Sequence, residues 1–265
     1  MTQVYKCSIL ENIKIGQNYF KMTISAPQVA KQSRAGQFVH LRCSNPPVSP
    51  FTKGGMRGII LRRPFSIHRV SGNKIEILYR VIGRGSLEIS RKKPKEFVDI
   101  IGPLGNGFKI AGNLKIAILV AGGMGVAPLV MLAEEMKSVK VLIGAKTKKE
   151  LLCEKEFKNL GCEVKVSTED GSKGFKGLVT ELLKQLLITH DSPPATALYA
   201  CGPKEMLKEI AVIAKKHKIP AQVSLEENMA CGIGACYGCP VMTKKGYKLI
   251  CKDGPVFNAN DIMWE

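Results

Sequence analysis

Four of the nine cysteines in this chain lie close together near the C-terminus, with glycines between them. Their spacing is Cys231-x4-Cys236-x2-Cys239, and Cys251 follows after the stretch PVMTKKGYKLI. Thiols grouped in this way can form two disulfides, bind a structural zinc ion or hold an iron–sulfur cluster. Each chemistry predicts a different protein, so the spacing and its context must discriminate between them.

The context favours an iron–sulfur cluster. An odd number of cysteines, and a start (MTQVYKCSILENIKIG) without an apolar export signal, indicate a reducing, cytoplasmic location that disfavours disulfides. Zinc sites more often repeat a C-x2-C pair twice, whereas C-x4-C-x2-C with one later cysteine is the plant-type spacing for a 2Fe–2S cluster. We predict Cys231, Cys236, Cys239 and Cys251 as its ligands; a zinc-stabilised binding module without a redox role is the alternative from another class.

A second candidate site consists of turns that follow three predicted strands. AGGMGVAP (121–128) joins a strand to a helix, so its backbone could approach a pyrophosphate, although Pro128 departs from the G-x-G-x-x-G pattern and tight packing alone would also explain the glycines. STEDGS (167–172) and CGP (201–203) end later strands. The candidate dinucleotide-binding residues are Gly122, Gly123, Gly125, Asp170, Cys201, Gly202 and Pro203, with Cys201 near the nicotinamide.

The residues after the second strand of this region leave the choice of coenzyme open. An acidic residue that would bind the ribose of NAD is not obvious there. Lys146, Lys148 and Lys149 occupy the segment instead, and they could accept the 2′-phosphate of NADP.

A third set of residues could hold another phosphate and an aromatic ring. In Arg63-Pro64-Phe65-Ser66 a rigid proline fixes an arginine beside an aromatic ring and a hydroxyl. LYR (78–80) and GRGS (83–86) follow, and Gly85 and Ser86 could offer backbone amides and a hydroxyl to a second phosphate. A surface arginine before an edge proline would equally explain the first motif taken alone.

The surrounding pattern predicts three parts. Short β-rich runs at 37–43, 57–67, 74–82 and 96–105 predict an antiparallel barrel over 1–110. Strands at 114–121, 139–145, 162–168 and 195–202 alternate with helices at 128–137, 148–160, 178–187 and 204–217, which predicts a doubly wound α/β domain over 111–220. Residues 221–265 form the cysteine module. The uncharged stretch 116–133 is broken by glycines and Pro128, so we expect a strand, turn and helix and no membrane span.

The strong positive charge does not indicate nucleic acid. The formal net charge is +18, but the lysines are spread in short groups and only 6% of residues are aromatic, which leaves little material for stacking bases. We expect a solvated basic surface, suited to an acidic protein partner or an anionic cofactor.

Several motifs together resemble the ferredoxin–NAD(P) reductase superfamily, in which a flavin-binding barrel precedes a pyridine-nucleotide domain: RRPFS, GRGS, GPLGNGF (102–108), AGGMGVAP, TEDGS and YACGP. The tail ENMACGIGACYGCPVMTKKGYKLICKDGPVF (227–257) resembles the electron-transfer subunits of class 1B dihydroorotate dehydrogenase, and the likeness covers the whole chain. It implies FAD contacts from Arg63, Pro64, Phe65, Ser66, Leu78, Tyr79, Arg80, Gly85 and Ser86. Phe65 stands where many reductases carry a tyrosine.

The resemblance also implies a function. Dihydroorotate would be oxidised on a separate FMN-containing catalytic subunit, and electrons would pass through the 2Fe–2S cluster and FAD to NAD+ in pyrimidine (UMP) biosynthesis. The partners would be that subunit, in a heterotetramer of two of each, and NAD(H); alone, the chain would be a diaphorase. The alternative is the small flavin and iron–sulfur subunit of an NAD(P)H–ferredoxin oxidoreductase, sulfide dehydrogenase or hydrogenase.

Overall fold

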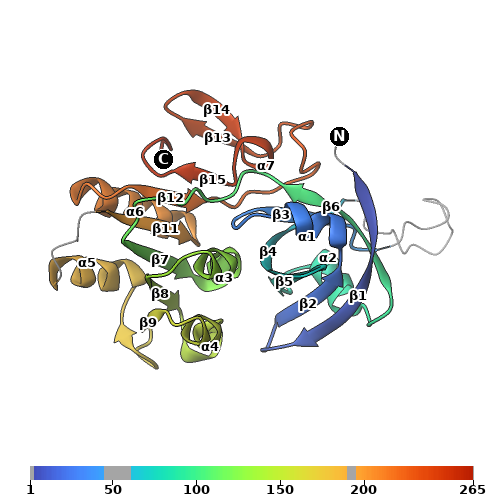
Figure 1. The fold of residues 1–265 in the computed structure, drawn as a ribbon, viewed down its shortest axis with the longest axis horizontal. Helices are drawn as coiled ribbons and strands as arrows, with labels where there is room; N and C mark the ends of the chain where they lie inside the picture. The colour runs from blue at the N-terminus through green and yellow to red at the C-terminus, as the bar shows by residue number, and fades with distance from the viewer. Residues whose placement is uncertain (1–2, 45–60, 190–194, 265) are drawn as a thin grey trace.

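Six antiparallel strands in the N-terminal part of the chain close into a barrel, in the order β1-β2-β5-β4-β3-β6 (Figure 1). The computed structural model describes residues 3–44, 61–189 and 195–264. The barrel elements are β1 (Val4–Lys14), β2 (Tyr19–Ser25), α1 (Pro27–Gln32), β3 (Phe38–Leu41), β4 (Arg63–Ser71), β5 (Lys74–Arg80), α2 (Arg84–Ser90) and β6 (Phe97–Leu104). The predicted barrel is confirmed.

The barrel also contains elements that the sequence pattern did not single out. β1 and β2 carry many charged and polar residues, so the alternation of apolar and polar side chains along them is weak. Residues Arg84–Ser90, directly after Gly83, form the short helix α2. β3, β5 and β6 lie within the runs predicted for them. The first residues of the expected strand 57–67 lie outside the described residues, and β4 begins at Arg63. Most of the proline-rich segment 44–55 also lies outside them.

The second half of the chain forms a seven-stranded sheet in the order β10-β9-β8-β7-β11-β12-β15. All neighbours are parallel except β15, which is antiparallel to β12. The strands are β7 (Ile116–Gly122), β8 (Val139–Ala145), β9 (Glu163–Thr168), β10 (Phe175–Lys176), β11 (Thr196–Cys201), β12 (Ala221–Ser224) and β15 (Val256–Asn258).

Helices cover both faces of this sheet, as predicted for a doubly wound fold (Figure 1). α3 (Ala127–Glu134) and α4 (Glu154–Asn159) lie on the face toward the barrel, and α5 (Val179–Thr189) and α6 (Lys204–Lys216) lie on the other face. The helix expected over 148–160 is broken. A single 3-10 turn, η2 (Lys148–Glu150), is followed by Cys153, whose φ of 59° ends any continuous helix before α4.

The long uncharged stretch forms the expected strand, turn and helix. β7 is followed by the 3-10 turn η1 (Gly123–Val126) and by α3. Within the described ranges, the helices are too short or too polar to cross a membrane.

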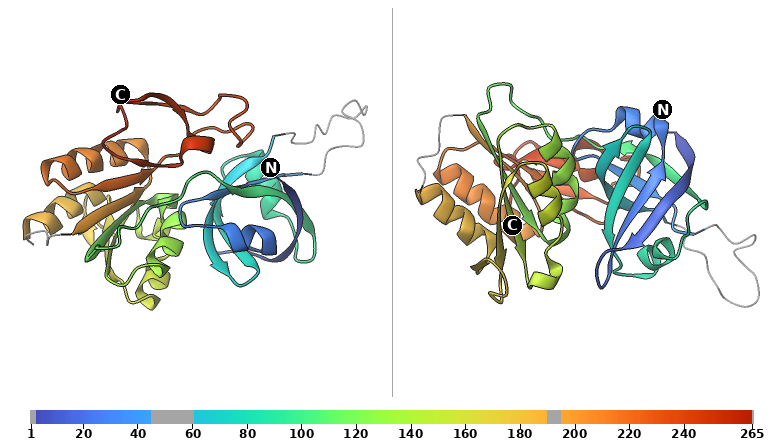
Figure 2. Two further views of the ribbon diagram at one scale, coloured as in Figure 1. Left: turned by 45° about the horizontal axis from the view of Figure 1, so that its top comes forward. Right: turned by 60° about the horizontal axis from the view of Figure 1, so that its bottom comes forward.

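In the sequence, the cysteine module is inserted between two paired strands of the sheet, β12 and β15. The chain leaves β12, forms the hairpin β13 (Pro240–Thr243) and β14 (Gly246–Leu249) and the short helix α7 (Ile250–Asp253), and returns as β15 (Figure 2). Cys239, Ile250 and Cys251 pack in the same apolar core as α5 and α6. The boundary expected at residue 220 therefore falls within the sheet, just before β12.

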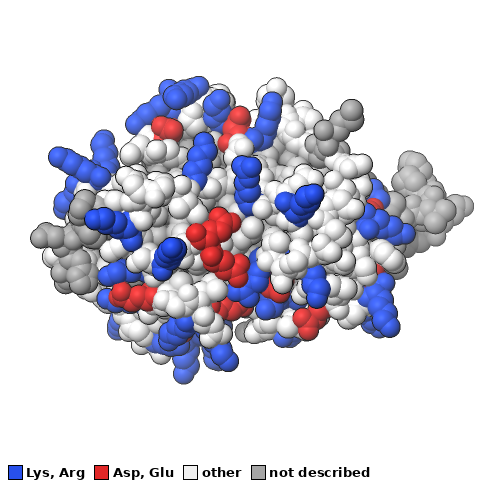
Figure 3. Space-filling model, viewed as in Figure 1, with Lys and Arg blue, Asp and Glu red and all other residues white. Residues whose placement is uncertain are grey.

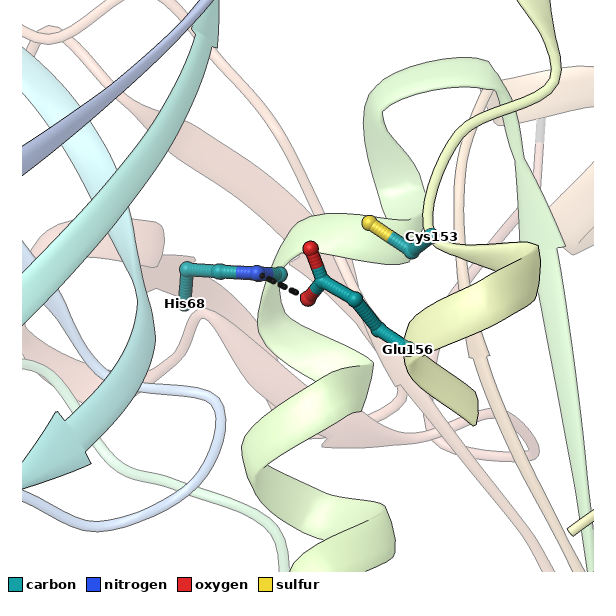
Figure 4. A group of neighbouring side chains, drawn as sticks. All are labelled: His68, Cys153 and Glu156. Carbon is teal, nitrogen blue, oxygen red and sulfur yellow. Dashed lines mark hydrogen bonds and ion pairs between the residues drawn. The ribbon is translucent and has the colours of Figure 1, made fainter. Parts of the chain in front are cut away.

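A buried histidine joins the barrel to the sheet. His68 on β4 is fully buried, and its Nδ1 lies 2.9 Å from the Ala127 carbonyl oxygen. Its Nε2 lies 2.9 Å from Glu156 Oε2 (Figure 4). A carbonyl oxygen only accepts hydrogen bonds, so Nδ1 donates to Ala127. The hydrogen bond from His68, with the nearby charge of Lys21, outweighs burial and lowers the pKa of Glu156 to about 2. Glu156 is therefore a carboxylate that lies in hydrogen-bonding contact with the ring.

Cys153 completes this cluster without making it a metal site. Its ligand atom and those of His68 and Glu156 lie within 4.8 Å of one another. Both ring nitrogens of His68 are already engaged, however, and the cations Lys21 and Arg69 act on the same carboxylate. Burial raises the pKa of the Cys153 thiol, which keeps it protonated. We interpret the cluster as an ionic hydrogen-bonded link between barrel and sheet.

We expect Glu156→Gln to destabilise the protein by about 1–3 kcal/mol at pH 7, because it removes the charged acceptor from a buried donor. A carboxylate whose pKa falls on folding contributes stability above its unfolded pKa and loses it as the pH drops toward the folded value. The difference in free energy of unfolding between wild type and variant should therefore begin to decrease below the ordinary glutamate pKa of 4.5. It should disappear toward about pH 2.

Urea titrations from pH 7 to pH 2 measure this effect. Glu163→Gln is the control, because Glu163 is half exposed and its ion pairs with Lys140 and Lys165 lie on the surface, where such pairs contribute little. Equal losses of stability in the two variants would contradict the interpretation.

Candidate cofactor site

A large cleft lies between the barrel and the carboxyl ends of the sheet strands. Its volume of about 1750 Å³ exceeds the roughly 300–1,000 Å³ of an ordinary ligand pocket, so it has room for more than one ligand. Its barrel wall includes all nine residues that the family resemblance assigned to FAD: Arg63, Pro64, Phe65, Ser66, Leu78, Tyr79, Arg80, Gly85 and Ser86. Residues from separate segments of the barrel thus converge on one surface.

Phe65 presents an aromatic ring to the cleft from a fixed position. Its ring meets the edge of Tyr79 at a centroid distance of 5.5 Å and an interplanar angle of 74°. Tyr79 is buried, stacks on Phe20 at 5.7 Å and donates its hydroxyl hydrogen to Asn12 Oδ1 at 2.9 Å. The hydroxyl of Tyr79 is therefore used inside the barrel, and its ring serves to brace Phe65.

Ser86 is used differently from the expectation. Its hydroxyl accepts the amides of Ile82 at 3.0 Å and Gly83 at 3.3 Å, and it donates to the Gly83 carbonyl at 3.1 Å. Those three bonds use its hydrogen and both lone pairs. A phosphate at this turn would have to bind backbone amides, because the hydroxyl already closes the turn.

The glycines after β7 have two distinct roles. A Cβ on Gly125 would lie 1.9 Å from the Cys201 carbonyl oxygen, so this glycine allows the turn to pack against the end of β11. Gly123 has a φ of 54°, and a Cβ there would meet no atom of the described residues within 4 Å, so this glycine leaves the turn open toward the cleft. The packing explanation that the sequence left open thus applies to Gly125, and the open space at Gly123 is compatible with ligand approach.

Two predicted nucleotide-binding residues do not line the cleft. Asp170 lies in the turn after β9, where its Oδ1 accepts the Ser172 amide at 2.9 Å, and its neighbour Glu169 lines the cleft instead. Cys201 is buried in the protein next to Gly202, which lines the cleft, and burial raises the pKa of its thiol. Gly122, Gly202 and Pro203 do line the cleft.

Glu226 is a cleft residue that the sequence reasoning missed. It lies just after the carboxyl end of β12, and desolvation by the surrounding protein raises its pKa. Its side chain is open to the cleft, and the walls of the cleft shield it from bulk solvent. Its position two residues after a parallel strand was the signal that could have identified it.

Backbone amides surround the thiols of the cysteine loop. Ile233 and Cys236 amides point at Cys231 Sγ from 3.5 and 3.4 Å, and the Gly234 amide points at Cys251 Sγ from 3.1 Å. Partial burial raises the pKa of Cys231, but these amides outweigh it and bring the value down to about 6. Such amides stabilise thiolates, which is the form that binds metal.

The four thiols are arranged as two pairs. Cys231 contacts Cys236 and Cys239 contacts Cys251, while Cys231 also acts electrostatically on Cys251 across the loop. In the described part of the chain, no three of these sulfurs lie within 4.8 Å of one another. A tetrahedral zinc site with Zn–S bonds of about 2.3 Å would bring all four within about 3.8 Å of each other. Two close pairs that do not all meet at this spacing suit two metal ions, so the residues fit a 2Fe–2S cluster better than zinc.

The cysteine module is attached to the barrel as well as to the sheet. Asn106, in the motif GPLGNGF, donates through Nδ2 to the Lys252 carbonyl at 3.1 Å and the Asp253 carbonyl at 2.9 Å, and its amide bonds the Gly254 carbonyl. A Cβ on Gly105 would lie 2.6 Å from that same Gly254 carbonyl oxygen. Residues beside the cysteines, Ala230 and Gly238, line the cleft. The cysteine loop therefore borders the cavity that the barrel and sheet enclose.

Comparison with known proteins gives two family matches. Residues 226–263 match the iron–sulfur cluster binding domain of dihydroorotate dehydrogenase B. Residues 119–211 match the oxidoreductase NAD-binding domain. The two matches cover the cysteine module and most of the sheet.

Full-length relatives agree with these matches. The chain is 38% identical over its whole length to the dihydroorotate dehydrogenase B (NAD+) electron transfer subunit of Desulforamulus reducens, and 38% identical over 98% of both chains to that of Caldanaerobacter subterraneus subsp. tengcongensis. Among solved structures, an NADH-dependent reduced ferredoxin–NADP oxidoreductase is similar with a TM-score of 0.83 and 30% identity, over 97% of this chain and 90% of the other. A ferredoxin NADP+ reductase from Neisseria gonorrhoeae shares the fold at 18% identity and a TM-score of 0.65, over 87% of this chain and 96% of the other.

We expect Gly125→Ala to disrupt the turn after β7, because the added methyl would overlap the Cys201 carbonyl oxygen and force backbone to move. The KM for NADH in dye reduction should rise at least about tenfold, with a stability loss of about 1–3 kcal/mol. Gly112→Ala is the matched control, since a Cβ at that position would meet no atom of the described residues within 4 Å. A Gly125→Ala protein with the kinetics and unfolding midpoint of the control would contradict this role.

Proposed function

The chain belongs to the family of electron transfer subunits of dihydroorotate dehydrogenase B, and on that premise we propose that it carries electrons from an FMN-containing catalytic subunit to NAD+. The observation that carries the proposal is the shared cleft. Residues next to Cys231 and Cys239, the flavin motif of β4 and the glycine turn after β7 all line one cavity. Three sites for redox groups are thus adjacent within one chain.

The chain's own residues position these groups. When bound, the 2Fe–2S cluster supplies one-electron transfer, and FAD converts single electrons into the hydride that reduces NAD+. Arg63 would pair with a flavin phosphate, and the braced ring of Phe65 would support the flavin from the barrel side. Gly123 leaves the nucleotide turn open for the coenzyme pyrophosphate.

We propose that the cysteine loop and its hairpin face the catalytic subunit. Cys236 is exposed, as are Ile233, Tyr237 and Tyr247, and apolar exposed side chains are suited to a protein interface. The module itself carries Lys244, Lys245, Lys248 and Lys252, and Figure 3 shows basic residues spread over the same face of the molecule. An acidic surface on the partner would complement them. We expect two copies of each subunit in the complex, in the cytoplasm.

The rival function is electron transfer with ferredoxin, as in the solved structure that is 30% identical to this chain. The two hypotheses share the fold and the cysteine module, so they differ only in the donor that meets the module. The match of residues 226–263 to the dihydroorotate dehydrogenase B domain favours the first.

We expect NADH to be preferred to NADPH. Lys146 lines the cleft, but so do Glu150 and Glu169, whose charges would repel a 2′-phosphate. The double variant Glu150→Gln, Glu169→Gln should raise kcat/KM for NADPH in dye reduction about tenfold relative to that for NADH. A wild-type protein with the higher kcat/KM for NADPH would show that Lys146 dominates this part of the cleft.

Cys236→Ser tests the electron path. The variant should lose most of its cluster, while NADH oxidation by artificial dyes survives because the flavin and nucleotide residues are intact. In the complex reconstituted with the catalytic subunit, reduction of NAD+ by dihydroorotate should collapse at least about a hundredfold. Cys162→Ser is the control, because Cys162 lies outside the module. Wild-type rates from dihydroorotate to NAD+ in Cys236→Ser would exclude the cluster from the path.

A further inference from the structure

His40 is a buried histidine whose side chain faces the cysteine module. Alternate residues of a strand point to opposite sides. On β3, Val39 and Leu41 pack into the core inside the barrel, whereas Phe38 packs with the core of the cysteine module. His40 lies on the Phe38 side and is 0% exposed. A polar ring is therefore enclosed between the barrel wall and the module.

The cysteine loop rests on this ring. A Cβ on Gly232 would lie 2.6 Å from His40 Nδ1, and Gly232 has a φ of 72°. Only a residue without a side chain allows the backbone next to Cys231 to approach the imidazole so closely. The sequence Cys231-Gly232 is thus matched to a histidine almost two hundred positions earlier in the chain.

Neither ring nitrogen of His40 has a hydrogen-bond partner among the described residues. An imidazole ring carries at least one N–H in either protonation state, so the buried His40 always offers a hydrogen-bond donor. Buried donors without an acceptor are rare, which indicates that the acceptor is completed only when the cysteine ligands hold their cluster.

The same residue is joined to the flavin motif. His40 pairs with Pro64 where β3 and β4 run side by side, and Arg62 Nη1 lies 3.4 Å from the His40 carbonyl oxygen. One residue thus contacts the strand that carries Arg63 to Ser66 through its backbone and the cysteine loop through its side chain.

We propose that His40 is a positioning residue for the 2Fe–2S cluster, supporting the cysteine loop and directing its N–H toward the anionic ligand set at Cys231. The proposal rests on the cluster ligands of the proposed function. A hydrogen bond to the ligand sulfurs stabilises the reduced cluster, which carries more negative charge, and so raises its reduction potential.

The test is a redox titration of the cluster in the purified holoprotein, followed by electron paramagnetic resonance. His40→Leu should lower the equilibrium constant for reduction of the cluster about tenfold, which is the effect of losing one hydrogen bond to a charged acceptor. For a one-electron couple this corresponds to a decrease in reduction potential of about 59 mV. His40→Gln keeps an N–H donor and should restore most of the shift. The flavin potential should stay unchanged in both variants.

His68→Gln is the matched control, because His68 is equally buried in the barrel but faces α3 and α4. The cluster potential of this variant should equal that of wild type. An unchanged potential in cluster-loaded His40→Leu, or the same shift in His68→Gln, would overturn the proposal.

A second measurement needs no variant. The chain has four histidines, so wild-type protein labelled with nitrogen-15 histidine should show one histidine nitrogen coupled to the reduced cluster in pulsed spectra. Absence of that coupling would overturn the proposal even if His40→Leu failed to fold. A chain that held zinc in place of about two irons would overturn the cluster itself, and with it the proposed function.

Discussion

The packing of α3 on β4 is the contact on which the rest of the structure depends. It makes the interior of the barrel and one face of the sheet a single apolar core, with His68 held between Ala127 and Glu156 at its edge. β4 presents Arg63 to Ser66 on one side of this contact, and α3 begins at the glycine turn on the other. The width of the cleft is therefore set by side-chain packing, and flavin and coenzyme must meet at a distance that the core determines.

The cysteine module is held by both halves. Asn106 bonds it to the end of β6, and β12 and β15 hold its two ends in the sheet. A relay needs its redox groups at fixed short separations, and a module attached at one point only would rotate. The three attachments explain why GPLGNGF and the tail DGPVF, far apart in the sequence, contain glycines that contact each other's backbone.

The sequence was most informative where one local pattern determines the structure. The barrel, the alternating strands and helices and the cysteine spacing were all predictable, because periodicity and ligand spacing are local properties. Asp170 and Cys201 show the limit, since whether a residue after a strand faces the cleft depends on the path of the turn. Glu226, His40 and His68 were missed because their surroundings come from segments distant in the chain. The break at Cys153 depends on a single left-handed residue that helix propensity does not indicate.

The position of β15 also bears on how the molecule is made. This strand covers the edge of β12, so the sheet stays incomplete until the segment Val256–Asn258 has been synthesised and has paired. Until then β12 has an uncovered edge that another chain could pair with. Once β15 is in place, the cysteine loop is closed at both ends by the sheet. A chain in which β15 had not paired would hold the cysteine loop to the sheet at one end only.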